Sequence, residues 1–126
     1  RELTVGVVGD EALPAVEICS ADGWYGFDAK YVRGDTVYAF PDPAAEPELL
    51  GRCRELALTT FGALGARGLG RVDFRVTEAG ECLVLELNSL PGFTATSLLP
   101  KAAAKAGIGF SALCARIIEL AACDAA

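Results

Sequence analysis

Two acids and an amide, Asp73, Glu86 and Asn88, lie on short apolar segments in the second half of the chain. Carboxylates on apolar strands are costly to bury unless a cation or hydrogen bonds compensate them. Mg²⁺ is usually held by one or two carboxylates together with the phosphate oxygens of a substrate. These residue types therefore indicate a site for magnesium and a nucleotide.

The elements that position these residues form a predicted β-hairpin. Residues 71–76 and 82–88 each suit a strand, and Gly80 between them is free to take the positive φ of a turn. Antiparallel pairing would then bring the two strands side by side.

Within this hairpin, Arg71, Asp73 and Arg75 share one face of the first strand because side chains alternate. Glu86 and Asn88 share a face of the second strand, and folding the hairpin brings Asp73 opposite them. We therefore expect three oxygen ligands to converge. An ordinary solvated hairpin, with Asp73 paired to an arginine, explains the spacing equally well.

The rest of the chain supplies strands and helices for a mainly antiparallel sheet covered by helices, an α+β fold. Pro14 argues for an edge or entry position in its strand. Strands are expected at residues 3–9, 12–18 and 36–40, and helices at 46–66, 97–106 and 111–122. The first helix should bury one apolar stripe, made of Leu49, Cys53, Leu56, Ala57, Phe61 and Leu64. The last should bury another, made of Phe110, Leu113, Cys114, Ile117 and Ala121.

Composition narrows the class of protein. A chain of 126 residues that is 52% hydrophobic suits a single globular domain, residues 1–126. Its net charge of −6 argues against nucleic-acid binding. No apolar run has the length of a membrane span, and no signal peptide is evident.

The cysteines argue against a zinc site. The five cysteines include no CxxC pair, and histidine is absent. Their scattered placement predicts reduced, mostly buried thiols in a cytoplasmic protein.

Several motifs in order resemble the last third of D-alanine–D-alanine ligases of the ATP-grasp superfamily. The matching segments are 1–7, Phe27-Asp28-Ala29-Lys30-Tyr31, Arg71-Val72-Asp73, residues 86–94 and Ser97-Leu98-Leu99-Pro100. The resemblance covers nearly the whole chain and implies the C-terminal half of an ATP-grasp fold. It also implies that the family's N-terminal and central domains are absent here.

The resemblance assigns roles around the phosphates. Glu86 would bridge two Mg²⁺ ions, with Mn²⁺ as a possible substitute, while Asp73 would hold one ion and Asn88 the other. Phosphoryl transfer depends on such positioning and charge neutralisation. Arg71 and the N–H of Gly92 would stabilise the oxyanion of the tetrahedral intermediate. A salt bridge from Arg71 to Asp73 or Glu86 is the structural alternative, as is a plain turn at Gly92.

The resemblance assigns further roles to the substrates. Lys30 would contact the transferred phosphate, and Tyr31 would close the site and favour D-alanine as second substrate. Glu2 would bind the ATP ribose, at a chain end where fraying is expected. Leu85 would line the adenine pocket. Ser97 and Leu98 would receive the carboxylate of the second D-alanine, because a helix N-terminus suits an anion; Ser97 as an ordinary helix cap is the alternative.

The implied activity is ATP-dependent joining of two D-alanines for peptidoglycan synthesis, in the cytoplasm, by a complete enzyme expected to be a homodimer. The fragment alone should be inactive. Two alternatives stay open at this point. One is another ATP-grasp carboxylate–amine ligase, and the other is a non-catalytic nucleotide-binding or interaction domain.

Overall fold

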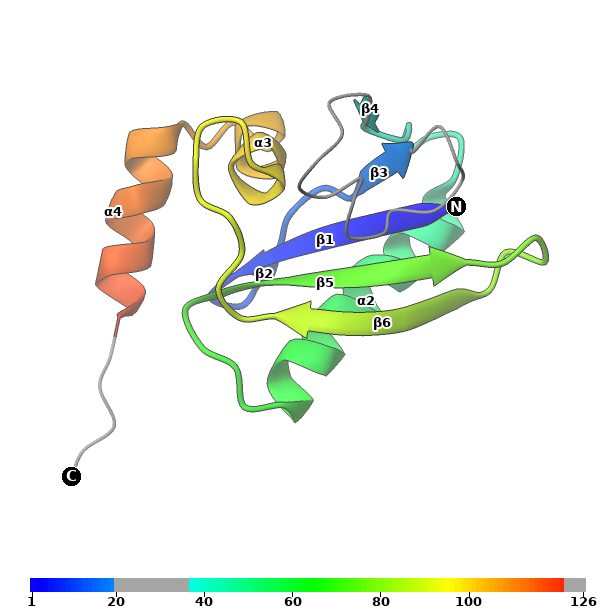
Figure 1. Cartoon of the computed structure of the whole chain (residues 1–126), viewed down its shortest axis with the longest axis horizontal. Coiled ribbons are helices and arrows are strands. Elements are labelled where there is room, and N and C mark those ends of the chain that lie inside the picture. The colour runs from blue at the N-terminus through cyan, green and yellow to red at the C-terminus, as the bar shows by residue number, and fades with distance from the viewer. Residues whose placement is uncertain (20–36, 122–126) are drawn as a thin grey trace.

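An antiparallel sheet in the order β4-β3-β1-β5-β6 forms the centre of the molecule (Figure 1). The computed structural model describes residues 1–19 and 37–121. The strands are β1 (Glu2–Val8), β2 (Glu11–Ala12), β3 (Val16–Cys19), β4 (Val37–Ala39), β5 (Leu69–Val76) and β6 (Cys82–Asn88). The helices are α2 (Pro47–Ala63), α3 (Leu98–Lys105) and α4 (Phe110–Leu120). Every pairing among these strands is antiparallel, which confirms the predicted α+β class.

The side chains of the central strand β1 alternate between the two faces of the sheet. Leu3, Val5 and Val7 are fully buried and point toward α2, which lies along one face (Figure 1). Together with apolar residues of α2 and β5 they form the first core. Its members on those two elements are Leu50, Cys53, Ala57, Phe61, Val72, Phe74 and Val76.

Among residues 1–19 and 37–121, the elements that pack on the opposite face are α3 and α4, at one end of the sheet. Val8 belongs to a second core with Leu13, Leu99 and Leu113. Gly6 permits this packing, because a Cβ added there would lie 3.1 Å from Leu13 Cδ1 and 3.2 Å from Leu99 Cγ. This face also carries polar residues of β1, β5 and β6, among them Thr4, Asp73 and Glu86.

The strand predicted at residues 12–18 is wrong as a single element. It is divided into β2 and β3, and residues 13–15 between them are irregular. Pro14 lacks a backbone N–H and so cannot continue a ladder. Leu13 N–H instead donates to Gly6 O at 2.8 Å, which holds the break against β1.

The first helix is shorter than predicted, and its buried stripe differs from the prediction at both ends. Leu64 follows the helix as its C-cap and is 65% exposed, whereas Leu50 is buried. Gly65 and Gly68 have positive φ angles of 64° and 76°, so the chain turns away before residue 66.

The apolar face predicted for the last helix is confirmed for Leu113 and Ile117 but is wrong for Phe110 and Ala121. Leu113 is buried, but Phe110 is 43% exposed, and Ile117 is only partly buried against the second core. The reason is position: α4 packs beside α3 at one end of the sheet, rather than across it (Figure 1). No helix in the described part of the chain is both long and apolar enough to cross a membrane.

Candidate functional site

The β5–β6 hairpin places the predicted metal ligands on one face. Asp73 pairs directly with Glu86, and Arg71 pairs with Asn88. Directly opposed residues in an antiparallel pair have Cβ atoms about 5 Å apart. The predicted antiparallel hairpin is therefore confirmed, with Gly80 at a φ of 82° in its turn.

A β-bulge at Leu85 makes this convergence possible. From Val76 to Phe74 the register is regular and pairs Phe74 with Val84, but the next pair is Asp73 with Glu86. Without the extra residue, Glu86 would lie opposite Val72 and face the core beneath α2. A one-residue slip sends side chains to the other face of a sheet. The bulge thus turns Glu86 toward Asp73.

The sequence reasoning missed this bulge, although a signal existed. A tight turn that pairs residue 76 with residue 82 places odd residues opposite odd ones, so Asp73 and Glu86 meet only if one residue is inserted. Bulges are frequent beside active sites, where they redirect a side chain. Leu85 itself is 51% exposed at the edge strand, so it is not a core residue.

Asp73 is held in place by two neighbours. Its side chain accepts hydrogen bonds from Arg71 Nε and Nη2, at 2.8 Å each, and from Thr4 Oγ1 at 2.6 Å. Asp73 is 6% exposed as a residue, and the Arg71 side chain is 12% exposed. The salt bridge considered as an alternative role for Arg71 is therefore present. A bidentate pair of this kind fixes both side chains. Oδ1 of Asp73 accepts from both Arg71 and Thr4, so both of its lone pairs are engaged.

Glu2 lies on the same face, further along β1. It pairs across the sheet with Arg75, whose Nη1 donates to Glu2 Oε1 at 2.9 Å. Its side chain is 10% exposed. The expected fraying is absent, because β1 begins at Glu2 and Val76 N–H donates to Arg1 O at 2.9 Å.

The loop after β6 joins this face to the start of α3. Asn88 Oδ1 accepts the N–H of Leu90 at 3.1 Å, which leads the chain into the Pro-Gly turn. A Cβ added to Gly92 would lie 3.3 Å from Ser97 Oγ, so the turn closely approaches the N-terminus of α3.

Ser97 is the N-cap residue of α3, but its side chain makes no capping hydrogen bond. Its Oγ instead accepts the N–H of Thr94 at 3.0 Å. The ordinary cap considered for Ser97 is therefore not formed. Leu98 begins the helix and is buried, so its backbone rather than its side chain would meet a ligand.

The donor set suits Mg²⁺ with phosphate. In residues 1–19 and 37–121, no three His, Cys, Asp or Glu side chains gather closely enough to hold an ion. Asp73 and Glu86 supply two carboxylates, and Asn88 adds an amide oxygen. Mg²⁺ is commonly bound by one or two carboxylates and completed by substrate phosphates and water. The residues therefore fit a metal that arrives with a nucleotide.

Lys30 and Tyr31 lie outside the described residues. Their predicted roles stay predictions.

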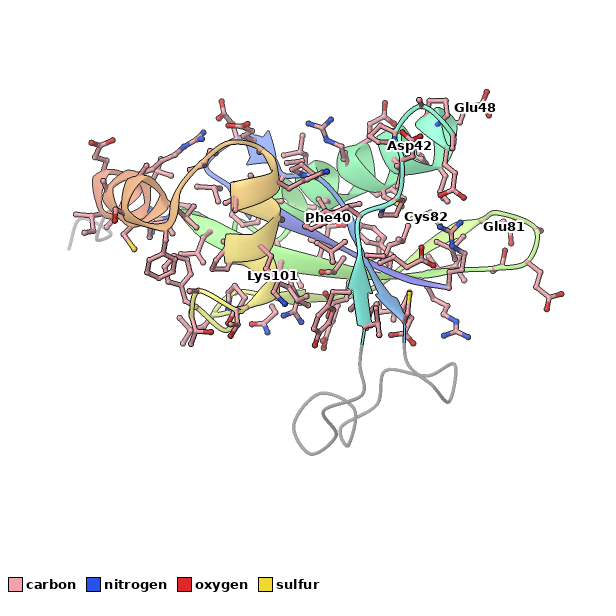
Figure 2. The ribbon with its side chains drawn as sticks, turned by 90° about the horizontal axis from the view of Figure 1, so that it is seen from above. Phe40, Asp42, Glu48, Glu81, Cys82 and Lys101 are labelled. Carbon is pink, nitrogen blue, oxygen red and sulfur yellow. The ribbon has the colours of Figure 1, made fainter. Side chains whose placement is uncertain are left out.

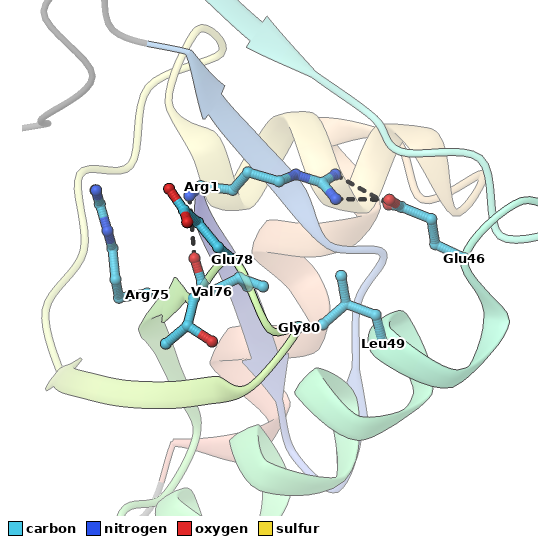
Figure 3. A pocket seen from close by; sticks show the side chains of 8 residues that line it. Arg1, Glu46, Leu49, Arg75, Val76, Glu78 and Gly80 are labelled. Carbon is cyan, nitrogen blue, oxygen red and sulfur yellow. Dashed lines mark hydrogen bonds and ion pairs between the residues drawn. The ribbon is translucent and has the colours of Figure 1, made fainter.

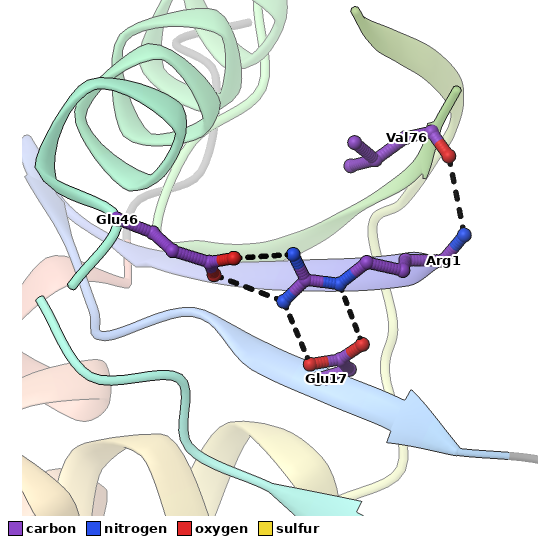
Figure 4. Close-up of polar contacts among 4 residues, drawn as sticks. All are labelled: Arg1, Glu17, Glu46 and Val76. Carbon is purple, nitrogen blue, oxygen red and sulfur yellow. Dashed lines mark hydrogen bonds and ion pairs between the residues drawn. The ribbon is translucent and has the colours of Figure 1, made fainter. Parts of the chain in front are cut away.

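A second group of charges lies on the α2 side of the sheet (Figure 4). The Arg1 guanidinium donates to Glu17 Oε1 at 2.8 Å and to Glu46 Oε1 at 2.6 Å. These bonds raise the pKa of Arg1 and lower the pKa of Glu46. This cluster could not be predicted from local patterns, because Arg1, Glu17 and Glu46 lie far apart in the sequence.

A hollow of about 690 Å³ lies beside Arg1 (Figure 3). Its lining includes Arg75, Val76 and Gly80, which places it at the turn end of the hairpin. It does not include Asp73 or Glu86, and Glu46 on its wall is already paired with Arg1. The hollow is therefore distinct from the Asp73–Glu86 site.

Comparison with known proteins decides the family. Residues 1–119 match the family described as D-ala D-ala ligase C-terminus. The chain belongs to this family. D-alanine–D-alanine ligase B of Chromobacterium violaceum is 47% identical over 118 residues, which are 94% of this chain and 39% of that protein. The ligase of Rhodospirillum rubrum is 46% identical over 126 residues, covering 99% and 41% respectively.

Solved structures of D-alanine–D-alanine ligases share the fold. The enzyme of Bacillus anthracis complexed with ATP superposes with a TM-score of 0.77 at 34% identity, over 94% of this chain and 37% of that one. The VanG D-Ala:D-Ser ligase of Enterococcus faecalis gives 0.77 at 30% identity, over 94% and 35%. The ATP-grasp fold is therefore confirmed. The chain spans about two fifths of the length of the D-alanine–D-alanine ligases it matches.

Proposed function

We propose that this chain is the metal- and phosphate-binding part of an ATP-dependent ligase that joins two D-alanines. ATP would phosphorylate the carboxylate of one D-alanine, and the amine of the second would displace phosphate to give D-alanyl-D-alanine and ADP. The product would serve peptidoglycan synthesis in the cytoplasm. The observation that carries the proposal is the bulge that turns Glu86 toward Asp73, on a face where Arg71 is already fixed.

The described residues divide the work between charge and position. Asp73, Glu86 and Asn88 would hold two Mg²⁺ ions, or Mn²⁺, which neutralise the phosphate charge when bound. Arg71 reaches toward the same place and is fixed by Asp73, so it can stabilise negative charge without reorganising. The N–H of Gly92 would donate to the same oxyanion.

The substrates would be held around this centre. Glu2 would bind the ribose hydroxyls, kept in position by Arg75, and Leu85 would contact adenine from the sheet edge. Backbone N–H groups at Ser97 and Leu98 would receive the carboxylate of the second D-alanine, favoured by the helix dipole. The closeness of Gly92 to Ser97 supports placing this carboxylate next to the oxyanion.

The proposal extends to two residues outside the described ranges and to the assembly of the complete enzyme. Lys30 would contact the transferred phosphate, and Tyr31 would close the site over D-alanine. The complete enzyme would be a homodimer. Residues 1–126 would form one domain that is inactive alone, because the remaining three fifths of the related enzymes' length has no counterpart in it.

The test is ATP-dependent phosphate release by the complete protein that carries this chain. With D-alanine alone we expect release, and Glu86→Gln should lower its rate by about 100-fold or more, the scale seen when one electrostatic catalytic group is removed. Glu81→Gln, in the exposed hairpin turn, is the matched control and should retain full rate. Equal rates for the two variants would contradict the assignment of Glu86.

Supplying D-serine or D-lactate with D-alanine tests the second substrate, because one structural relative is a D-Ala:D-Ser ligase. A rate gained only with such an acceptor would keep the ligase mechanism and overturn the role given to Tyr31. No release with any acceptor would favour another ATP-grasp ligase or a non-catalytic domain.

A further inference from the structure

Two cysteines from different elements contact each other on the α2 side of the sheet. Cys53 on α2 and Cys82 at the start of β6 have their Sγ atoms 2.7 Å apart. Both belong to the packing of the first core, where Cys53 is fully buried and Cys82 is partly buried. Cys82 lies where the hairpin strand leaves its turn, next to Glu81 (Figure 2).

The pair differs from the other described cysteines. Cys19 is exposed on β3 and Cys114 is partly exposed on α4, and all four are free thiols. The prediction that the thiols are mostly buried is therefore wrong for this part of the chain, where only Cys53 is buried. Only Cys53 and Cys82 have another cysteine within hydrogen-bond distance among these four.

The geometry points to a site of reversible oxidation: we propose that Cys53 and Cys82 form an intramolecular disulfide by exchange with a low-molecular-weight disulfide such as oxidised glutathione. A covalent S–S bond is about 2.05 Å long, so the two sulfurs need to approach by less than about 1 Å. This inference is independent of the proposed ligase activity.

The two environments set the order of the steps. Cys82 is partly exposed, so its thiolate meets the reagent first and attacks one sulfur, forming a mixed disulfide and releasing one reduced thiol. Cys53 then attacks Cys82 Sγ, which breaks the mixed disulfide and releases the second thiol, and the Cys53 proton passes to that leaving group. One reagent disulfide is reduced to two thiols, and the protein pair is oxidised by two electrons.

Burial explains why Cys53 acts second. Burial and the neighbouring Cys82 sulfur both raise the pKa of the Cys53 thiol, so it is seldom a thiolate on its own. Attack on a tethered partner avoids the need to meet the reagent in solution. The crosslink would join α2 to the strand that carries Glu86 and Asn88 at its far end.

The experiment treats the complete protein with oxidised glutathione at neutral pH, blocks remaining thiols and maps tryptic peptides by mass spectrometry. Trypsin cleaves after Arg52, Arg54, Arg75 and Lys101, so the dipeptide Cys53–Arg54 would be joined to residues 76–101. We expect this crosslinked pair, with the loss of two hydrogens, and its disappearance after reduction. Modification of the exposed Cys19 shows that the reagent was active.

Variants give the controls. Cys114→Ser should form the same crosslink, whereas in Cys53→Ser the Cys82 thiol should remain as a mixed disulfide with glutathione. The oxidised wild-type protein should also unfold at a temperature about 5–10 °C higher than the reduced one, because the crosslink restricts the unfolded chain.

Two results would overturn the proposal. One is a wild-type protein in which Cys82 stays joined to glutathione, as it does in Cys53→Ser. The other is a protein in which Cys19 is modified while Cys53 and Cys82 are both recovered as free thiols.

Discussion

The two faces of the sheet are formed by the same strands, but one face buries apolar side chains and the other buries polar ones. Toward α2, the side chains of Val5 and Val72 are completely buried among apolar neighbours. On the other face, Thr4 and Asp73 are almost as buried, yet they are hydrogen-bonded to each other, and Asp73 also accepts hydrogen bonds from Arg71. Polar groups at such depth contribute little net stability compared with apolar ones. The apolar face is therefore explained by folding, whereas the polar face needs another reason, and the proposed magnesium–nucleotide site supplies one.

The largest loss of stability should come from Asp73→Ala, on the polar face of the sheet. The Arg71 guanidinium would lose its bidentate partner in a site where its side chain is 12% exposed. Removing one member of a buried ion pair costs about 3–5 kcal/mol. Urea unfolding of the complete protein measures this loss, and Glu78→Ala in the exposed turn should stay within about 0.5 kcal/mol of wild type.

A double variant separates the ion pair from other effects. Arg71→Leu combined with Asp73→Leu removes both charges, so its cost should be well below the sum of the two single substitutions. An additive result would show that Asp73 and Arg71 do not act as a pair.

A second prediction compares how tightly the two faces are packed. A Cβ at Gly70 would lie 2.8 Å from Phe61 Cε2 on the α2 side, closer than the 3.1 Å from Gly6 to Leu13 on the other side. Overpacking typically costs about 1–3 kcal/mol. Gly70→Ala should therefore lower the free energy of unfolding more than Gly6→Ala does. The reverse order would mean that Phe61 yields more easily than Leu13 and Leu99.

The smallest change in stability should come from removing a charge of the Arg1, Glu17 and Glu46 cluster on the α2 side. Hydrogen bonds from Arg1 lower the pKa of Glu46 in the folded state. A lowered folded-state pKa gives stability that is present above the unfolded-state pKa and is lost as pH falls through the folded one.

Glu46→Gln should therefore lower stability slightly at neutral pH, where the Glu46 contribution is fully present, and should flatten the loss of stability on acidification below about pH 5, where wild type and variant become alike. Thermal unfolding across pH measures it, and high salt should shrink the difference because the groups are near the surface. An unchanged acid limb in the variant would show that the Arg1–Glu46 contact does not hold in solution.

Local patterns in the sequence predict most of the fold. Alternation and Gly80 define the hairpin, and helical spacing defines α2, because these signals depend on neighbours along the chain. The missed details depend on tertiary contacts. Pro14 divides a strand where Leu13 bonds to Gly6, and α4 exposes Phe110 because it lies beyond the end of the sheet.

The candidate site shows the same division. Residue types and spacing identify Asp73, Glu86 and Asn88, but their meeting depends on the bulge at Leu85, which a regular hairpin would not contain. The bonds from Thr4 to Asp73 and from Arg75 to Glu2 could not be predicted either, since each joins strands far apart in sequence.

The most direct test of the central claim is calorimetric binding of ATP to the complete protein in the presence of Mg²⁺. If the Asp73–Glu86 face is the magnesium–nucleotide site, Glu86→Gln should weaken Mg²⁺-dependent ATP binding by about 10-fold or more, while Glu78→Gln at the hairpin turn should bind as the wild type does. Equal affinity in wild type and Glu86→Gln, with both proteins folded, would contradict the account.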